Sequence, residues 1–216
     1  AQFKYAYTII DAKIDQNGHP GSYHSKPINI INFERKGNTE SDIQLSSAKE
    51  ISAAIIQATE NTLRTIKIFT PDLEAEIYNN DEFRKQLLNF TRENRHAQIQ
   101  ILVDDITTAL HNGHKLIGLA QQMSSIITIK DTPADFQGTN ISFILFDQSE
   151  FIFKPDKTSQ IAIFSKCKNR SNKLHEFFTS AWDQAEKTAI QEDSEYKHVL
   201  TRKQKNVIEK QPYISH

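Results

Sequence analysis

Residues 140–147 read Asn-Ile-Ser-Phe-Ile-Leu-Phe-Asp, an apolar run of strand length between polar residues. Two further β segments, 151–154 and 160–165, follow at the spacing of hairpins. After them comes a stripe of apolar side chains at helical spacing, formed by Leu174, Phe177, Phe178, Ala181, Trp182 and Ala185. The pattern predicts three strands and then a helix that packs over the sheet. We expect Asn140 and Asp147 at the two ends of one central strand, and Trp182 almost fully buried.

Helices and strands alternate upstream of this stretch. The sequence predicts one helix that begins with a capping box at Ser47–Glu50 and another that Asp81 caps. Strands are expected at 64–70, 97–103 and 125–130, with a helix before the last of them. Strands joined by helical crossovers pair in parallel, whereas the later hairpins introduce antiparallel pairing. The predicted fold is therefore α/β, with a mixed, mainly parallel sheet and helices on both faces.

The first 45 residues have the pattern of a separate arm. Phe3, Tyr5 and Tyr7 alternate with smaller or polar residues, which puts three aromatic rings on one face of a strand. Turn residues at 17–21 and a second apolar segment at 27–35 complete a β-hairpin, and a polar linker follows. An isolated hairpin is marginally stable, so the aromatic face packs either on its own domain or on a second copy of the chain. The expected division is an arm and linker at 1–45, an α/β domain at 46–190 and a polar tail at 191–216.

The composition is that of an ordinary globular protein. Hydrophobic residues make up 38% and charged residues 25% of the 216 residues, and 26 basic side chains balance 27 acidic ones. A chain without clustered cations is not expected to bind nucleic acid strongly or to lie on an anionic membrane. No apolar run reaches the ~20 residues that span a bilayer, and no signal-peptide pattern opens the chain. We therefore expect a cytoplasmic protein whose single cysteine, Cys167, is a free thiol.

The element order, with Phe177 and Trp182 spaced as Phe-x4-Trp, resembles one repeat of the phospholipase-D-like superfamily. Enzymes of that superfamily carry His-x-Lys-x4-Asp on a central strand. There the histidine attacks phosphorus, the lysine neutralises the non-bridging oxygens, and the aspartate supports the local structure. The matching stretch here has Asn140 at the histidine position and Ser142 at the lysine position, and it keeps the aspartate as Asp147. Because loss of a covalent nucleophile costs on the order of 10⁶ in rate, the resemblance implies a degenerate, non-catalytic member.

Several short segments carry a second resemblance, which covers residues 46–190. They are Thr70–Leu73, Ile101–Asp105, Gly113–Leu116, Leu119–Ala120 and Ser124–Ser125. These segments are similar to an uncharacterised bacterial family whose domain often follows a GNAT-type acetyltransferase domain. The phosphate cradle of such enzymes, Arg/Gln-x-x-Gly-x-Gly/Ala, is missing from this sequence, which has six glycines. The resemblance therefore implies a domain that accompanies an acetyltransferase and does not itself carry that activity.

Polar side chains follow two of the expected parallel strands. Asp72 comes after the first of them, and Asp104 and Asp105 come directly after the second. Ligands of open α/β sheets bind beyond the carboxyl ends of parallel strands. These aspartates and His114 are therefore the candidate residues of a ligand or partner site.

Metal and cofactor sites are not predicted. His111 and His114, with the nearby aspartates, have side chains that bind Zn²⁺ or Mn²⁺, but Gly113 interrupts the pair. The sequence contains no Walker loop and no dinucleotide fingerprint. No residue set therefore predicts a nucleotide cofactor.

The leading hypothesis is a non-catalytic, phospholipase-D-like binding or regulatory module. It would act through a protein partner or as a homodimer, with Phe3, Tyr5 and Tyr7 as the interface. One alternative is a phosphodiesterase or nuclease that uses displaced residues such as His114, Asp104 and Asp105. Another is an accessory subunit of an acetyltransferase encoded elsewhere.

Overall fold

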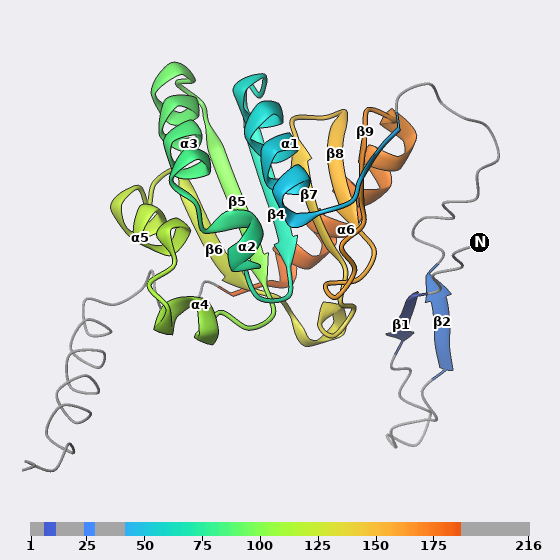
Figure 1. Ribbon diagram of the computed structural model, residues 1–216. Helices are drawn as coiled ribbons and strands as arrows, with labels where there is room; N and C mark the ends of the chain where they lie inside the picture. The colour runs from blue at the N-terminus through green and yellow to red at the C-terminus, as the bar shows by residue number, and fades with distance from the viewer. Residues whose placement is uncertain (1–6, 12–23, 29–41, 187–216) are drawn as a thin grey trace, which may run out of the picture.

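The computed structural model describes residues 42–186, together with the backbone of two strands at 7–11 and 24–28. The main body contains one seven-stranded sheet with the order β3-β9-β8-β7-β4-β5-β6 (Figure 1). The strands are β3 (Ile43–Leu45), β4 (Thr65–Thr70), β5 (Gln98–Val103), β6 (Ile127–Asp131), β7 (Ser142–Phe146), β8 (Glu150–Lys154) and β9 (Ala162–Ser165). Strands that are far apart in the sequence, such as β4 and β7, therefore lie side by side.

Parallel pairing is confined to one end of this sheet. Strand β4 pairs in parallel with β5, and β5 with β6, as expected for strands joined by helices. The other four pairings, β4 with β7, β7 with β8, β8 with β9 and β9 with β3, are antiparallel. The predicted mixed sheet is confirmed, but within the described residues antiparallel pairings outnumber the parallel ones that we expected to dominate. The reason is that β7 pairs antiparallel with the distant strand β4, β8 and β9 follow as hairpins, and β3 adds a further antiparallel edge.

Helices cover both faces of the sheet, as predicted. They are α1 (Ala48–Glu60), α2 (Ala75–Tyr78), α3 (Asp81–Glu93), α4 (Thr107–His111), α5 (Lys115–Gln122) and α6 (Lys168–Gln184), with the 3₁₀ helix η1 (Ala134–Phe136) before β7. Figure 1 shows α1 and α3 on one face and α6 on the other. None of the helices in the described part of the chain is long and apolar enough to cross a membrane.

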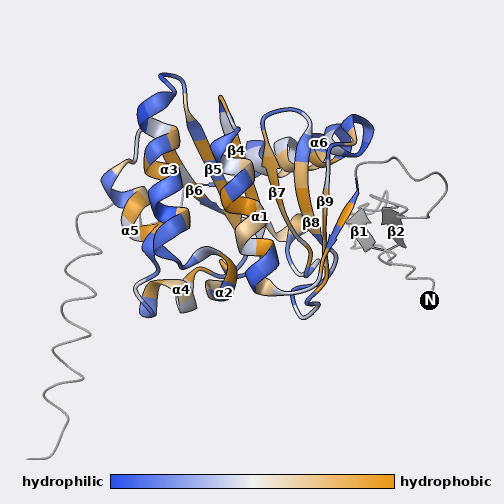
Figure 2. Cartoon of the chain, turned by 45° about the horizontal axis from the view of Figure 1, so that its top comes forward, coloured by the Kyte–Doolittle hydropathy of each residue, from blue (hydrophilic) through white to orange (hydrophobic). Residues whose placement is uncertain are grey.

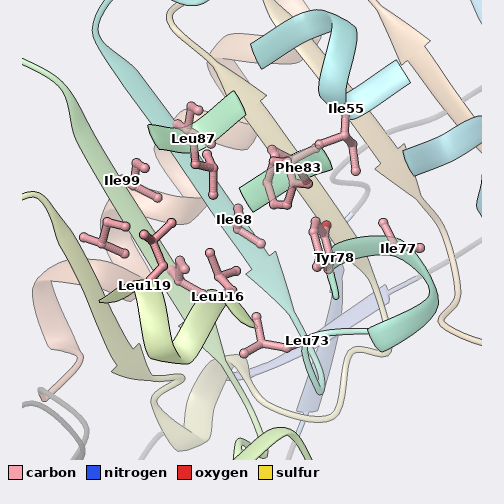
Figure 3. Close-up of a cluster of buried hydrophobic side chains, with 14 of the residues drawn as sticks. Ile55, Ile68, Leu73, Ile77, Tyr78, Phe83, Leu87, Ile99, Leu116 and Leu119 are labelled. Carbon is pink, nitrogen blue, oxygen red and sulfur yellow. The ribbon is translucent and has the colours of Figure 1, made fainter. Parts of the chain in front are cut away.

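Alternating side chains of the strands build two hydrophobic cores. Ile66 and Ile68 of β4 belong to the first core, under α1, α2, α3 and α5, whereas Phe69 belongs to the second, under α6. Figure 3 shows part of the first core, where Ile68 lies among side chains from α3 and α5. The hydropathy colouring of Figure 2 shows the apolar strands enclosed between helices with polar outer surfaces. The period-2 pattern of the strands therefore buries both faces of the sheet.

Local signals in the sequence determine where the helices begin. The Ser47 hydroxyl accepts a hydrogen bond from the Glu50 amide at 3.2 Å and caps α1, as the capping box predicted. The predicted cap of α3 is wrong by one residue, because Asn80 accepts a hydrogen bond from the Phe83 amide at 2.7 Å. Asp81 lies instead in the first turn of α3, where its negative charge interacts favourably with the helix dipole.

The central strand and the last helix lie where the sequence predicts them. Asn140 precedes β7, Asp147 follows it, and β7 is the middle strand of the seven. Helix α6 packs over the sheet and buries Phe178 completely. Trp182 is only partly buried, so the prediction of nearly full burial is wrong. Its ring stacks on Phe178, with centroids 5.6 Å apart, and the ammonium of Lys130 lies 4.6 Å from the ring centroid on the outer side of the core.

The N-terminal segment contains an antiparallel pair of strands. Strand β1 (Tyr7–Asp11) pairs with β2 (His24–Ile28), and Tyr7 lies opposite Ile28. The second strand therefore begins before the predicted segment 27–35. Phe3, Tyr5 and the side chain of Tyr7 lie outside the described part of the chain, as does the tail at 191–216. The packing of the aromatic face thus stays a prediction.

Candidate binding site at the strand ends

Five strands bring one of their ends to the same edge of the sheet. Strands β4, β5 and β6 end there, β7 begins there because it is antiparallel to β4, and β8 ends there because it is antiparallel to β7. Five charged side chains at this edge interact through ion pairs or nearby charges: Asp72, Glu74, Asp104, Lys154 and Lys157. We call these five residues the strand-end site.

Two of the predicted site residues, Asp72 and Asp104, belong to this site. The Asp104 carboxylate accepts a hydrogen bond from the Gly138 amide at 3.1 Å, and an oxygen of Asp72 lies 3.8 Å from Nζ of Lys157. Burial raises the pKa of Asp104 and the charge of Asp72 adds to this effect, although the hydrogen bond from the Gly138 amide acts in the opposite direction. Oδ1 of each aspartate is buried without a hydrogen-bond partner. The two carboxylates therefore keep unused acceptors.

The other two predicted residues have structural roles outside this charged group. Asp105 is exposed, and its Oδ1 accepts a hydrogen bond from the Thr107 amide at 2.8 Å at the start of α4. His114 is 3% exposed, and its Nδ1 accepts a hydrogen bond from the Leu116 amide at 3.2 Å, which caps α5. Burial lowers the pKa of His114, so the ring favours the neutral form. Both side chains thus accept hydrogen bonds from backbone amides at the start of a helix, Asp105 at α4 and His114 at α5.

The described residues contain no group of three His, Cys, Asp or Glu side chains that could hold a metal ion. His111 is exposed at the end of α4, whereas His114 is buried. The spacing of the two histidines in the sequence therefore does not produce a shared site.

Asn140 and Ser142, which we aligned with the histidine and the lysine of the motif, offer neither an imidazole nor a cation. Asn140 is exposed and has a left-handed backbone (φ 55°), and its carbonyl accepts a hydrogen bond from the Lys157 amide at 2.8 Å. Ser142 is 2% exposed and shares a hydrogen bond with the hydroxyl of Tyr78. Both residues thus contribute neutral polar groups near the strand-end site.

Asp147 lies at the opposite end of β7 and has a structural role. Its carboxylate accepts hydrogen bonds from the amides of Leu63, Arg64 and Thr65, each at 2.8 Å. Its own amide donates to the carbonyl of Thr65 at 2.9 Å. These bonds connect the start of β4 to the end of β7, away from the strand-end site.

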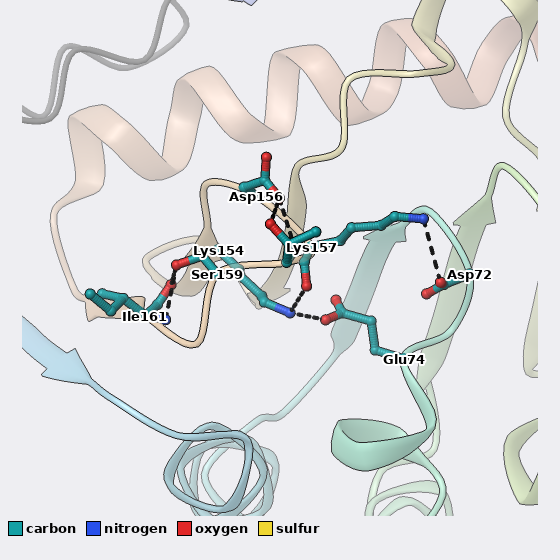
Figure 4. A network of polar contacts seen from close by, with 8 residues as sticks. Asp72, Glu74, Lys154, Asp156, Lys157, Ser159 and Ile161 are labelled. Atoms are coloured by element: carbon teal, nitrogen blue, oxygen red, sulfur yellow. Dashed lines mark hydrogen bonds and ion pairs between the residues drawn. The ribbon is translucent and has the colours of Figure 1, made fainter.

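A lysine that our sequence analysis missed lies beside Ser142. Lys154 is directly opposite Ser142 in the antiparallel pair β7–β8, so its ammonium group comes from the neighbouring strand. Nζ of Lys154 forms an ion pair with Oε2 of Glu74 and donates to the carbonyl of Lys157 at 2.8 Å (Figure 4). The side chains of Lys154 and Glu74 are only 9% and 10% exposed. The place beside the lysine position of the motif is therefore filled by a buried, internally neutralised charge.

One signal in the sequence could have found Lys154, but none marks Glu74. Lys154 ends an apolar strand and is two residues after Ile152, so the alternation of a strand puts both on the same buried face. A lysine on such a face needs a partner. Glu74 follows a turn without periodicity, and its role depends on contacts with distant residues.

Two hollows of the described surface lie away from the strand-end site. One, of about 380 Å³, runs along α6 beside His175, Thr179 and Asp183. The other, of about 260 Å³, lies between the ends of α1 and α3, beside Glu60 and Glu93. The strand-end site differs from both because its ion pair is packed inside the protein.

Solved structures with similar folds include phospholipase D family members. Nuc from Salmonella typhimurium, a phospholipase D family member, matches with a TM-score of 0.50 and 11% identity over 68% of this chain and 97% of that chain. NucT from Helicobacter pylori matches with a TM-score of 0.50 and 9% identity, over 68% and 98%. These similarities show a phospholipase-D-like fold, and at such identities they show the fold alone.

The same fold is found in a protein described as an archaeal chromatin protein with a novel mode of DNA binding, TrmBL2. It matches with a TM-score of 0.50 and 15% identity over 72% of this chain, which spans 57% of TrmBL2.

The sequence matches no curated protein. A family model described as a domain of unknown function, DUF7931, matches residues 47–193, and the chain belongs to this family.

Proposed function

We propose that this chain is a non-catalytic member of the phospholipase-D-like fold that acts as a binding or regulatory module. Its target would be a protein partner or a second copy of the chain. The observation that carries this proposal is the buried Glu74–Lys154 ion pair beside Ser142. The superfamily enzymes neutralise a phosphate with the lysine of their motif. In this chain the lysine directly opposite Ser142 is already neutralised by the carboxylate of Glu74.

The absence of a usable nucleophile at the strand-end site supports the proposal. Asn140 has an amide in place of the imidazole, and the nearby His114 is buried with Nδ1 engaged in the cap of α5. His175 lies on α6, with its Nδ1 3.5 Å from Nζ of Lys67, and its ring is near the backbone of Asp147 at the opposite edge of the sheet. A phosphodiesterase with displaced residues would therefore need a histidine to leave a structural position.

The charge of the site also disfavours a phosphodiester. Three carboxylates, those of Asp72, Glu74 and Asp104, accompany the two ammonium groups of Lys154 and Lys157. A phosphate would add negative charge next to Asp72 and Asp104, and catalysis of its transfer depends on positive groups that stabilise the developing charge. The buried lysine is nevertheless the one observation that favours the phosphodiesterase alternative.

An assay of the full chain tests the proposal. The purified protein is incubated with bis(4-nitrophenyl) phosphate and with single-stranded DNA, with and without Mg²⁺, Mn²⁺ or Zn²⁺. We expect no turnover above the buffer background. Turnover that disappears in both Lys154→Met and His114→Asn would overturn the proposal, whereas turnover that persists equally in both variants identifies a contaminating enzyme.

Rebuilding the motif provides a second test. The double variant Asn140→His and Ser142→Lys restores two side chains, but the new lysine would lie directly opposite Lys154 on a buried face. Two adjacent buried ammonium groups repel each other and cannot share one carboxylate without cost. We expect this variant to be inactive and less stable than the original chain in urea titrations. Rapid phosphodiester turnover by it would mean that the rest of a catalytic pocket is intact.

A further inference from the structure

A row of polar side chains crosses three neighbouring strands beneath α2. Ser142 of β7 lies opposite Lys154 of β8. On the other side of β7, the antiparallel pair of Phe69 and Phe143 places Thr70 of β4 opposite Ser142. Thr70, Ser142 and Lys154 are all buried. By alternation they lie on the face that carries Ile68, Ile144 and Ile152. Three polar residues in a row on an otherwise apolar face call for a polar partner.

Tyr78 of α2 adds a further hydroxyl above this row. It is 3% exposed, and its hydroxyl shares a hydrogen bond with Ser142. Burial and the nearby charge of Glu74 raise its pKa well above the ordinary value for tyrosine, so the hydroxyl keeps its proton and can donate. An ammonium group and several hydroxyl donors around one space are the groups that hold an oxyanion.

The occupant of this space is Glu74. One of its carboxylate oxygens, Oε2, forms the ion pair with Lys154, while Oε1 is buried without a hydrogen-bond partner. The hydroxyl of Thr70 is likewise buried without a partner. The internal carboxylate thus neutralises the lysine but leaves hydrogen-bonding groups of the row unused. A ligand that has more oxygen atoms, or that is not tethered to the backbone, can form hydrogen bonds with more of these groups.

The backbone before Glu74 is strained. Leu73 has φ 58°, the left-handed region that side chains other than glycine rarely adopt, and Leu73 is fully buried in the first core (Figure 3). Strain of this kind persists only where the surrounding packing imposes it, and it is often found at ligand sites. The bend immediately precedes Glu74, so a change of conformation at Leu73 would move this carboxylate relative to Lys154.

We propose that Thr70, Ser142, Lys154 and Tyr78 form an oxyanion-binding site that Glu74 occupies as an internal ligand. An external carboxylate or phosphate group binds when the turn at Leu73 moves Glu74 out of the site. This inference rests on the proposed function, since it describes a site that binds an anion without transforming it. Carboxylates and phosphates share the required chemistry, and the experiment separates them.

The experiment removes the internal ligand from the full chain. In Glu74→Gln the buried ammonium of Lys154 loses its counterion, which destabilises the protein until another anion takes the place. Thermal unfolding is measured in a chloride buffer and with increasing inorganic phosphate or acetate at constant ionic strength. We expect Tm of this variant to rise saturably by at least about 3 °C with one or both anions. The matched control Glu76→Gln, which changes an exposed glutamate of the same helix, should show no such rise.

A second variant locates the effect. Lys154→Met in the Glu74→Gln background should abolish the response to both anions, because the ammonium group is gone. If Glu74→Gln is unfolded in the chloride buffer, phosphate or acetate should restore its folding. A Glu74→Gln protein that gains no saturable stability from either anion, or a response that persists without Lys154, overturns the oxyanion site.

The same variant distinguishes this inference from the proposed function. Anion binding by Glu74→Gln without hydrolysis of bis(4-nitrophenyl) phosphate supports both. Hydrolysis that depends on Lys154 would overturn the non-catalytic function and leave the oxyanion site in place. If the variant shows neither anion binding nor hydrolysis, the oxyanion site is overturned and the non-catalytic function is not.

Discussion

Asp147 joins two segments that are far apart in the sequence, and its chemistry does not depend on catalysis. The carboxylate accepts three backbone hydrogen bonds from residues 63–65 at the start of β4. These bonds hold β4 against β7 whatever side chains stand at positions 140 and 142. The role of Asp147 in the fold is therefore independent of the chemistry of Asn140 and Ser142.

Replacing Asp147 with asparagine should destabilise the fold. The amide keeps one acceptor oxygen, but its NH₂ group faces backbone N–H donors and the negative charge is lost. Hydrogen bonds to a charged group contribute about 1.5–3 kcal/mol each, so we expect a loss of roughly 3 kcal/mol in the free energy of unfolding. Urea titration measures it, with Asp135→Asn, a change at an exposed carboxylate, as the control. Equal stability of the two variants would contradict the role assigned to Asp147.

The buried histidines predict how stability depends on pH. Burial lowers the pKa of His114, and burial together with the charge of Lys67 lowers the pKa of His175. Protons therefore bind the unfolded chain more tightly, with an ordinary pKa of about 6.5, and stability falls as the pH drops below about 6.5. In His114→Asn the side chain can still accept from the Leu116 amide, so we expect the cap to remain and this fall to become shallower.

Urea titrations between about pH 7.5 and pH 5.5 test this dependence. His111→Asn is the matched control, because His111 is exposed and the sequence change is the same. We expect the control to follow the original chain. Identical slopes for His114→Asn and the original chain would show that the buried ring does not resist protonation.

Helix α6 shows how far a periodic pattern predicts an element. The apolar stripe correctly predicted the helix and its packing over the sheet, because burial of one face is what such spacing encodes. The depth of each side chain did not follow from the spacing. Trp182 lies near the end of the helix, where the ammonium group of Lys130 in β6 lies over the ring and donates to the Trp182 carbonyl, so its surroundings depend on the path of β6.

Two substitutions in α6 should therefore differ in their effect. Phe178 is fully buried and contacts Phe143, with ring centroids 6.5 Å apart, so Phe178→Ala should cost about 3–5 kcal/mol. Trp182 is partly buried, and Trp182→Ala should cost about 1–2 kcal/mol, mainly through the lost stacking and cation–π contacts. Denaturant midpoints of the two variants measure the difference. A larger loss for Trp182 would mean that this ring has a partner outside the described residues.

Short elements were harder to predict than long ones. Strand β3 has only three residues, Ile43–Leu45, which is too few to show a period, and its existence depends on hydrogen bonds to β9. The ion pair of Asp42 and Arg170, with N and O 2.5 Å apart, fixes this edge from a helix that lies far away in the sequence. The same dependence on distant partners hid Glu74, since only the assembled sheet brings it to Lys154. Asp72 and Asp104 could be predicted because strand ends follow directly from the strand pattern.

At the scale of the whole molecule, one sheet separates two hydrophobic cores and gathers five charged residues at one edge. The fold similarity covers 97% of Nuc and 98% of NucT. We expect the proposed partner or second copy to contact the outer surface of the domain. The aromatic arm is the part of the sequence with the strongest requirement for such a contact.

Deleting residues 1–36 tests whether the arm provides it. Phe3, Tyr5 and Tyr7 share one face by sequence pattern, and each aromatic side chain can bury about 150–250 Å². Monomeric proteins seldom leave such a patch in water, so we expect the full chain to elute as a dimer and the shortened chain as a folded monomer in gel filtration. The triple change of these three residues to serine should have the same effect without removing the strand. A full chain that is monomeric at all accessible concentrations contradicts the dimer, and a shortened chain with a much lower Tm but unchanged oligomeric state assigns the arm to its own domain.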